Sequence, residues 1–254
     1  MASIPLIGPV EAEVTVEEAA AITKKKVRPP RSVKSTELVL TRRERKVVSQ
    51  LEHVYRSMYT TLLPDLDLTV GTILGITSAV RGEGRTTTAL GMALSMARDL
   101  EAHVVLVEAD LDHPSLANKL GIYAGPGLAH VLEEKACLDE ALCLLPEIDL
   151  SILPAGDTTI STSRLLRSQA LREVIQRLRS PRMIVIVDMP PALASPDVVP
   201  LSQLVDGVAI VVRSGVTPMK MIEESIDFIG REHIRGVILN AQRSKIPQWL
   251  RKFI

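Results

Sequence analysis

Short apolar runs alternate with amphipathic segments along most of the 254-residue chain. The apolar runs are nearly continuous, a pattern typical of strands that are buried on both faces of a sheet. They predict strands at Ile73–Ser78, His103–Glu108, Leu150–Leu153, Met183–Asp188, Val208–Val212 and Gly236–Asn240.

The segments between these strands repeat apolar residues three and four positions apart, which is the spacing of one helix face. They predict helices at 42–63, 86–100, 138–145, 164–178, 198–204 and 219–230. Strands that alternate with helices favour an α/β fold, in which helices cover both faces of a mostly parallel central sheet. The sequence shows no internal repeat and no second core, so a single domain is expected over residues 41–243.

The two ends of the chain lie outside this pattern. Residues 1–40 hold an acidic stretch and then a basic, proline-containing one without a periodic apolar face, which predicts a disordered tail. Within residues 244–254, the apolar side chains of Trp249, Leu250, Phe253 and Ile254 alternate with Arg251 and Lys252. This composition predicts a short amphipathic tail that contacts a membrane surface, lies in a partner's groove or packs on its own domain.

Composition narrows the classes of function. The chain has 30 Lys and Arg against 30 Asp and Glu, and this balance argues against binding nucleic acid through net charge. Neither a signal peptide nor an apolar run long enough to span a bilayer is visible, so a cytoplasmic protein is expected. The two cysteines, Cys137 and Cys143, are expected to be small buried hydrophobic residues.

The segment after the first strand carries the strongest chemical signal. Residues 78–88 read S-A-V-R-G-E-G-R-T-T-T and depart from the phosphate-binding pattern G-x-x-x-x-G-K-[ST] at Ala79 and Arg85. Because Gly82 and Gly84 lack a Cβ, the backbone can approach an anion closely there. The N–H groups that open the next helix would point at such an anion. The sequence predicts a nucleotide site made of Gly82, Glu83, Gly84, Arg85, Thr86 and Thr87.

Two further strands end in carboxylates. The strand at 103–108 runs into Glu108-Ala109-Asp110, and the strand at 183–188 ends at Asp188. In open parallel sheets, ligands bind beyond the carboxyl ends of the strands. Oxygen ligands suit a hard cation, so Thr86, Asp110 and Asp188 are candidate ligands for Mg²⁺. For any one strand-end acid taken alone, a helix cap or a turn is the competing interpretation.

These motifs resemble those of the bacterial tyrosine kinases (BY-kinases) of capsule and exopolysaccharide synthesis. Together with the septum-site and plasmid-partition ATPases, that family belongs to the deviant-Walker P-loop ATPases. Residues 77–87 are similar to its T-S-x-x-P-G-E-G-K-[ST]-T, residues 108–114 to its D-A-D-L-R-x-P, and residues 188–191 to its D-T-P-P. The resemblance covers residues 45–243. It implies a P-loop NTPase domain that uses ATP and Mg²⁺ and transfers the γ-phosphate to protein tyrosine.

The resemblance also implies residue roles and a partner. It assigns phosphate binding to residues 82–87, metal binding to Thr86, Asp110 and Asp188, and an adenine contact to Asn240. Arg85, Asp110 and Asp188 would be the catalytic residues. The implied activator is a membrane polysaccharide co-polymerase, or chain-length regulator, which would hold the protein at the inner membrane.

Some features depart from the family pattern. Arg85 replaces the loop lysine, and Glu108 replaces the first aspartate of the second motif. Of the oligomerisation motif E-x-x-R-x-x-R, only Arg56 is left, so a docked edge helix is expected here in place of a ring contact. The C-terminal tail has no tyrosine, so a tyrosine substrate would lie elsewhere on the chain or on another protein.

Two other functions remain open. One is a catalytically degenerate, nucleotide-binding scaffold or regulator of the same system, which Arg85, Glu108 and the reduced motif favour. The other is a partition-type ATPase that acts as a dimerisation switch, although Val80 stands where that class usually has a second lysine. If Arg85 is a defect in a kinase, Arg85→Lys is expected to preserve or raise turnover.

Overall fold

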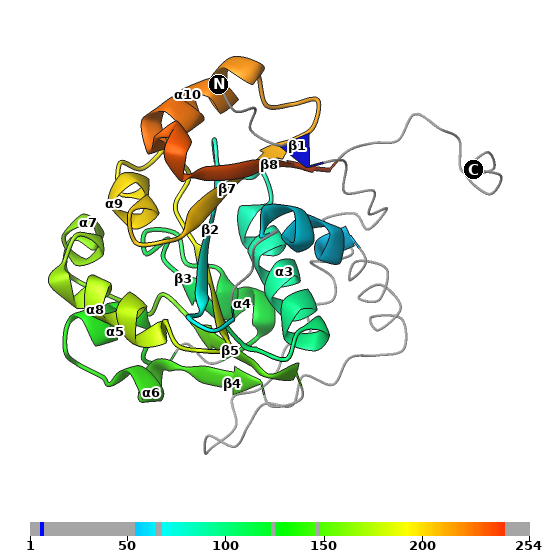
Figure 1. Cartoon of the computed structure of the whole chain (residues 1–254). Helices are drawn as coiled ribbons and strands as arrows, with labels where there is room; N and C mark the ends of the chain where they lie inside the picture. The colour runs from blue at the N-terminus through cyan, green and yellow to red at the C-terminus, as the bar shows by residue number, and fades with distance from the viewer. Residues whose placement is uncertain (1–5, 8–53, 64–67, 123–124, 146–147, 242–254) are drawn as a thin grey trace.

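A computed structural model describes residues 6–7, 54–63, 68–122, 125–145 and 148–241. Within these residues, one eight-stranded sheet runs through the molecule in the order β1-β8-β7-β2-β6-β3-β5-β4 (Figure 1). Neighbouring strands are parallel except for β4 and β5, which are antiparallel. The strands are β1 (Leu6–Ile7), β2 (Thr72–Ser78), β3 (His103–Glu108), β4 (Cys143–Leu145), β5 (Leu150–Leu153), β6 (Met183–Asp188), β7 (Gly207–Arg213) and β8 (Ile234–Asn240).

Helices connect most of these strands and cover the sheet. Residues 54–62 are also helical. The labelled helices are α3 (Arg85–Asp99), α4 (Leu116–Leu120), α5 (Leu128–Leu132), α6 (Leu138–Ala141), α7 (Thr162–Leu166), α8 (Gln169–Leu178), α9 (Val198–Ser202), α10 (Met219–Ile229) and the 3-10 turn η2 (Arg231–His233).

Successive residues of each strand pack into two different cores. In β3, Val105 and Val107 belong to a core that includes side chains of α5, α8, α9 and α10. Val104 and Leu106 belong to a second core on the other face, which includes α3, α4 and helical residues 54–62. Because side chains alternate along a strand, Glu108 falls on the same face as Leu106. The end of β3 therefore turns its acid toward the helices α3 and α4.

The predicted α/β fold is confirmed. All six predicted strands are present, and the central sheet is mostly parallel with helices on both faces. Near-continuous apolar runs could identify these strands because each is buried on both sides, as the fully buried β2 shows.

The helix predictions need correction in three places. The helix predicted at 138–145 ends at Ala141, and Cys143–Leu145 instead pairs with β5 as the edge strand β4. The helix predicted at 164–178 is two helices, because the Ser168 hydroxyl accepts a hydrogen bond from the Leu171 N–H and starts α8. The helices α4 and α5 were not predicted, since five residues are too few to show a helical period.

Two further expectations change. Cys137 is exposed just before α6, and Cys143 is only partly buried in the edge strand β4, so the prediction of buried cysteines is wrong. Leu6 and Ile7, inside the predicted disordered tail, pair with Val237 and Ile238 of β8, so the tail prediction is wrong for these two residues. The other residues of 1–40 and the predicted tail at 244–254 lie outside the described part of the chain.

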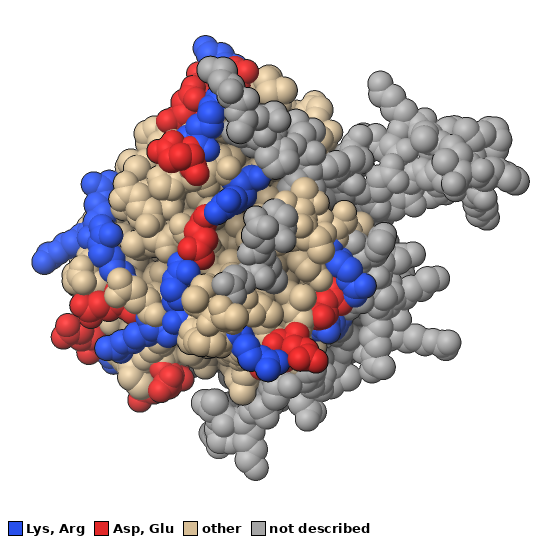
Figure 2. Space-filling model, viewed as in Figure 1, with Lys and Arg blue, Asp and Glu red and all other residues tan. Residues whose placement is uncertain are grey.

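The described surface mixes both signs of charge. On the face seen in Figure 2, Lys and Arg side chains are interspersed with Asp and Glu, and neither sign gathers into one field. None of the described helices combines the length and the apolar character that crossing a bilayer requires.

Candidate functional site

The predicted phosphate loop lies between the end of β2 and the start of α3. Gly82 and Gly84 adopt left-handed conformations with φ of 83° and 92°, which side chains disfavour. A Cβ on Gly82 would meet no atom within 4 Å, so the backbone faces open space there. Gly84 opens α3, which no side chain caps. The N–H groups of this first turn, where Thr86 is buried and Thr87 exposed, can therefore donate to an anion.

Glu83 holds the loop in this shape. Its carboxylate is buried and accepts hydrogen bonds from the Val80 N–H at 2.8 Å, the Arg213 N–H at 3.4 Å and the Thr217 hydroxyl. Val80 belongs to the loop itself, whereas Arg213 and Thr217 flank the connection from β7 to α10. The predicted nucleotide residue Glu83 therefore braces the loop from within and ties it to the neighbouring strand end.

Asn240, the predicted adenine contact, also lies against the loop. Its side-chain nitrogen donates to the Glu83 carbonyl at 2.8 Å, and its side-chain oxygen accepts from the Ala241 N–H at 2.8 Å. A Cβ on Gly84 would lie 2.0 Å from that side-chain nitrogen, so the close approach requires glycine. In this structure both ends of the Asn240 amide are engaged within the chain.

Arg85 joins the two strand-end carboxylates that the sequence assigns to a metal. Its Nε lies 2.7 Å from Oδ1 of Asp188, and its Nη2 lies 2.7 Å from Oδ2 of Asp110. The three side chains are nearly buried, with exposed fractions of 10%, 1% and 4% for Arg85, Asp188 and Asp110. Burial lowers the pKa of Arg85, but the charges of Asp188 and Asp110 outweigh it and raise the pKa above its ordinary value. The three predicted catalytic residues thus form one ion cluster.

One carboxylate oxygen of Asp188 forms no hydrogen bond with the described residues. Its Oδ2 is buried and has no hydrogen-bond partner among the described residues, while the Thr86 side chain is hydrogen-bonded to the same carboxyl group. Burial raises the pKa of Asp188, and the charge of Arg85 with the hydrogen bonds from Thr86 and Arg85 offsets part of this effect. A buried oxygen without a partner is uncommon in folded proteins, and a bound cation or its water would satisfy it.

Thr86 and Asp188 therefore fit Mg²⁺ better than Asp110 does. A hydroxyl beside an unpartnered carboxylate oxygen suits a hard cation or its bound water. Asp110 is already bound through Oδ2 by Arg85. No cluster of three or more His, Cys, Asp or Glu side chains in the described ranges could hold a metal, so the remaining ligands would have to come from water or from a nucleotide.

Glu108 is bound by backbone groups. Its Oε1 accepts from the N–H groups of Ser115 at 2.5 Å and Leu116 at 2.8 Å, and its Oε2 accepts from the Ala155 N–H at 3.1 Å. These bonds fix the start of α4 and the loop after β5 at the end of β3. For Glu108, the helix-cap interpretation of a strand-end acid is the correct one.

Helical residues 54–62 pack on α3 and contain the one residue left of the oligomerisation motif. Arg56 binds Asp99 at the end of α3, with its Nε 2.8 Å from Oδ2. The Tyr59 hydroxyl donates to the same oxygen at 3.0 Å. Tyr55 and Tyr59 are both buried. The expected docked edge helix is confirmed for these residues, and Arg56 is used inside the chain.

Lys119 on α4 lies beside the site, although no sequence motif marks it. Its Nζ is 3.0 Å from the Ser115 hydroxyl, and the residue is half-buried. Burial lowers the pKa of Lys119, and the nearby charges of Asp188 and Glu108 oppose that effect. A single lysine on a five-residue helix forms no sequence pattern. Its position near Asp188 and Glu108 becomes visible only in the folded structure.

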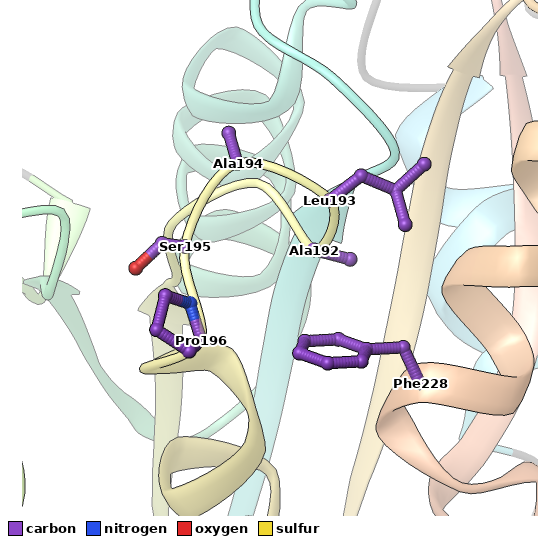
Figure 3. A pocket seen from close by; sticks show the side chains of 6 residues that line it. All are labelled: Ala192, Leu193, Ala194, Ser195, Pro196 and Phe228. Carbon is purple, nitrogen blue, oxygen red and sulfur yellow. The ribbon is translucent and has the colours of Figure 1, made fainter.

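The loop that follows Asp188 leads to an apolar pocket. Residues 192–196 and Phe228 of α10 line a hollow of about 250 Å³, and Figure 3 shows the Phe228 ring pointing toward the loop. The N–H groups of Ala192 and Leu193 donate to the carbonyls of Ser78 and Ala79 at 2.8 and 3.1 Å. One wall of the pocket is therefore hydrogen-bonded to the start of the phosphate loop.

Comparison with known proteins gives relatives, although no protein-family model matches the chain. The chain is 29% identical over 170 residues to the tyrosine-protein kinase YwqD of Bacillus subtilis, a match that covers 66% of this chain and 71% of YwqD. It is 27% identical over 173 residues to the succinoglycan biosynthesis transport protein ExoP of Rhizobium meliloti, covering 66% of this chain but only 22% of ExoP.

Solved structures that resemble this fold include the domain of another kinase. The kinase domain of VpsO superposes with a TM-score of 0.68 at 28% identity, over 80% of this chain and all of that domain. The septum site-determining protein MinD of Pyrococcus horikoshii, complexed with Mg-ADP, gives 0.57 at 21% identity over 72% of this chain and 76% of MinD, which shows the fold alone. The chain is thus similar in sequence to bacterial tyrosine-protein kinases, and it has the fold seen in the kinase domain of VpsO and in MinD.

Proposed function

We propose that this protein is an ATP-binding, tyrosine kinase-like ATPase that transfers the γ-phosphate to protein tyrosine and regulates the export or chain length of a capsule polysaccharide or exopolysaccharide. The observation that carries the proposal is the junction of β2 and α3. There, left-handed glycines and an uncapped 15-residue helix open onto the cluster of Asp110 and Asp188. The kinases to which the chain is similar support the same function.

Each part of the site has a task in this proposal. The backbone N–H groups of residues 82–87 bind the phosphates, and Glu83 keeps the loop rigid. Thr86 and Asp188 would hold Mg²⁺. Asp110 lies next to them, because Arg85 binds both Asp110 and Asp188. When bound, Mg²⁺ would neutralise charge on the β- and γ-phosphate oxygens. Phosphoryl transfer needs positioning and charge neutralisation more than covalent help, which such a rigid site can supply.

The phosphate acceptor is proposed to be a tyrosine other than Tyr55 and Tyr59. Tyr55 and Tyr59 are 8% and 4% exposed, and the Tyr59 hydroxyl is bonded to Asp99. Burial raises the pKa of each to about 12, so neither is prepared to act as a nucleophile. Tyr123, which lies outside the described residues, or a tyrosine of another protein is therefore the proposed acceptor.

The proposed setting is the cytoplasmic side of the inner membrane. A membrane polysaccharide co-polymerase, or chain-length regulator, would activate the protein there, and the tail at 244–254 would add a contact with the membrane surface. This setting comes from the family resemblance. The relation to ExoP, whose name places it in succinoglycan biosynthesis and transport, supports it.

A phosphotransfer assay tests the proposal. Purified protein with ATP, Mg²⁺ and the cytoplasmic segments of its co-polymerase is expected to yield phosphotyrosine, which mass spectrometry would locate on Tyr123 or on the partner. Asp188→Asn should abolish the signal, because it removes the charge at the proposed metal site. The matched control is Asp227→Asn, which changes an exposed acid on α10.

A nucleotide-binding scaffold of the same system is the second candidate. Arg85 favours it, because a guanidinium held by two carboxylates is not free to assist phosphoryl transfer. Protein that binds ATP in a direct titration but forms no phosphotyrosine with its partner present would decide for the scaffold. Protein that binds neither ATP nor ADP, with or without Mg²⁺, would exclude both candidates.

A further inference from the structure

The loop has no lysine at position 85 to bind the terminal phosphates of a nucleotide. Phosphate loops of this kind use a lysine ammonium to reach the terminal phosphates of the nucleotide. Here the corresponding side chain is Arg85, whose guanidinium is bound by Asp110 and Asp188. A nucleotide at residues 82–87 would meet backbone N–H groups, but the cation at position 85 is already engaged.

A second cation is placed at the same end of the sheet by α4. Glu108 and Asp188 are register partners on the neighbouring strands β3 and β6. The N–H groups of Ser115 and Leu116 bind the Glu108 carboxylate, so α4 begins next to the strand end that carries Asp188. Leu116 packs in the same core as α3, and Lys119 follows it by three residues. Residues three apart lie on neighbouring parts of one helix face, so Lys119 flanks the buried side of α4.

The ammonium group of Lys119 is available for a ligand. Nζ donates a hydrogen bond to the Ser115 hydroxyl at 3.0 Å, and no carboxylate of the described residues lies within 4.0 Å of it. Its charge nevertheless acts on Asp188 and Glu108, and it is repelled by Arg85. The flexible stem of the half-buried Lys119 can turn its ammonium group toward a phosphate bound near Asp188, whose charge it already feels.

We propose that Lys119 supplies the ammonium that binds the terminal phosphates of the nucleotide, in place of the lysine that position 85 lacks. Arg85 then serves as a fixed internal cation that keeps Asp110 and Asp188 in position. This inference rests on the proposed nucleotide-binding function.

Equilibrium titration with ATP, ADP and AMP tests the inference. A hydrogen bond from a charged group contributes roughly the equivalent of 10- to 100-fold in affinity, so Lys119→Met should weaken ATP and ADP binding by about that factor. AMP has no β- or γ-phosphate, so its affinity should change by less than about threefold if the contact is with the terminal phosphates. Lys119→Arg should restore most of the lost affinity. The control Lys220→Met, an exposed lysine on α10, should bind all three as the wild type does.

Chemical protection provides a test that needs no variant. Amine-reactive acetylation of the full chain, read by mass spectrometry, should modify Lys119 in the free protein and spare it when ATP is bound. Exposed Lys135 and Lys220 should react equally in both states.

The outcomes separate the inference from the function on which it rests. If wild-type protein binds ATP but Lys119→Met binds it equally well, and Lys119 is not protected, the role of Lys119 is wrong and nucleotide binding stands. If wild-type protein binds no nucleotide, the proposed function itself fails. Thermal unfolding of the nucleotide-free variant should match the wild type, which distinguishes a lost contact from a lost fold.

Discussion

At the scale of single residues, Arg85 departs furthest from what its position suggests. A cation directly after the glycine loop is expected on phosphate, but here it is held by Asp110 and Asp188. A guanidinium offers several N–H donors in a planar fork, so one side chain can satisfy two acids at once. A lysine ammonium is a point charge and cannot reproduce this geometry. Arg85 therefore has a structural role in the nucleotide-free protein.

We expect Arg85→Lys to lower the free energy of unfolding of the nucleotide-free protein by about 1–3 kcal/mol, because one carboxylate would lose its charged partner. Urea unfolding followed by circular dichroism would measure the change. The control is Arg81→Lys in the same loop, where the side chain is exposed and little change is expected. Equal stability of Arg85→Lys and wild type would show that the two acids do not depend on the guanidinium.

The sequence could identify the members of the site better than their contacts. Glycines, a threonine and strand-end acids carry a recognisable pattern, so Gly82, Thr86, Asp110 and Asp188 could be predicted as neighbours. Which acid holds which cation depends on distances between strand ends, and these are set by the register of β3 and β6. That register is not written in any single motif, so the Arg85 contacts and the place of Lys119 could not be predicted.

At the scale of helices and strands, length decides what the sequence could show. The 15-residue α3 and the apolar strands are long enough to repeat their pattern, and they were predicted to within one or two residues. Five-residue helices and the three-residue β4 have no room for a period. Their shape comes from contacts distant in sequence, such as the bonds of Glu108 to the start of α4.

The contact between α3 and helical residues 54–62 provides a test of packing. A Cβ on Gly91 would lie 2.1 Å from Cζ of the buried Tyr55. Alanine favours a helix interior over glycine by about 0.5–1 kcal/mol, whereas overpacking costs about 1–3 kcal/mol. We therefore expect Gly91→Ala to destabilise the protein in urea unfolding. In a Tyr55→Ala background the sign should reverse, because the ring is gone and only the helix preference remains.

A change of sign between the two backgrounds would show that the contact with the Tyr55 ring causes the loss of stability in Gly91→Ala. If Gly91→Ala stabilises the otherwise unchanged protein, the two helices do not approach each other as closely as described. If it destabilises both backgrounds equally, the loss has a source other than Tyr55.

At the scale of the whole molecule, an ion pair between Arg56 and Asp99 joins helical residues 54–62 to the end of α3. Arg56 and Asp99 are 43 residues apart, and Tyr59 and Ser95 add hydrogen bonds to the same acid. The hydrogen bond from Arg56 is the largest cause that lowers the pKa of Asp99 below its ordinary value of 3.8, and burial opposes it. Arg56, the one residue left of the oligomerisation motif, thus stabilises the single chain.

This attachment predicts a pH dependence of stability. The folded-state pKa of Asp99 lies below its unfolded value, so its contribution is present above that value and is lost as the pH falls through the folded-state pKa. Asp99→Asn should therefore be less stable than wild type at neutral pH, and the difference should shrink as the pH falls below 3.8. Urea unfolding at several pH values would measure it, with the exposed Asp227→Asn as control. A difference that stays constant across this range would contradict the role of Asp99.

The backbone bonds from Ala192 and Leu193 to Ser78 and Ala79 have a consequence for energetic communication. A ligand bound against the Phe228 ring would contact residues 192–196, and a ligand bound at the glycine loop would contact the segment to which these residues are hydrogen-bonded. If binding at either end displaces that segment, each ligand must change the affinity of the protein for the other by the same factor. Coupling between two binding equilibria is reciprocal. A change in hydrogen exchange at the Phe228 end of α10 could then report on a nucleotide bound at the glycine loop.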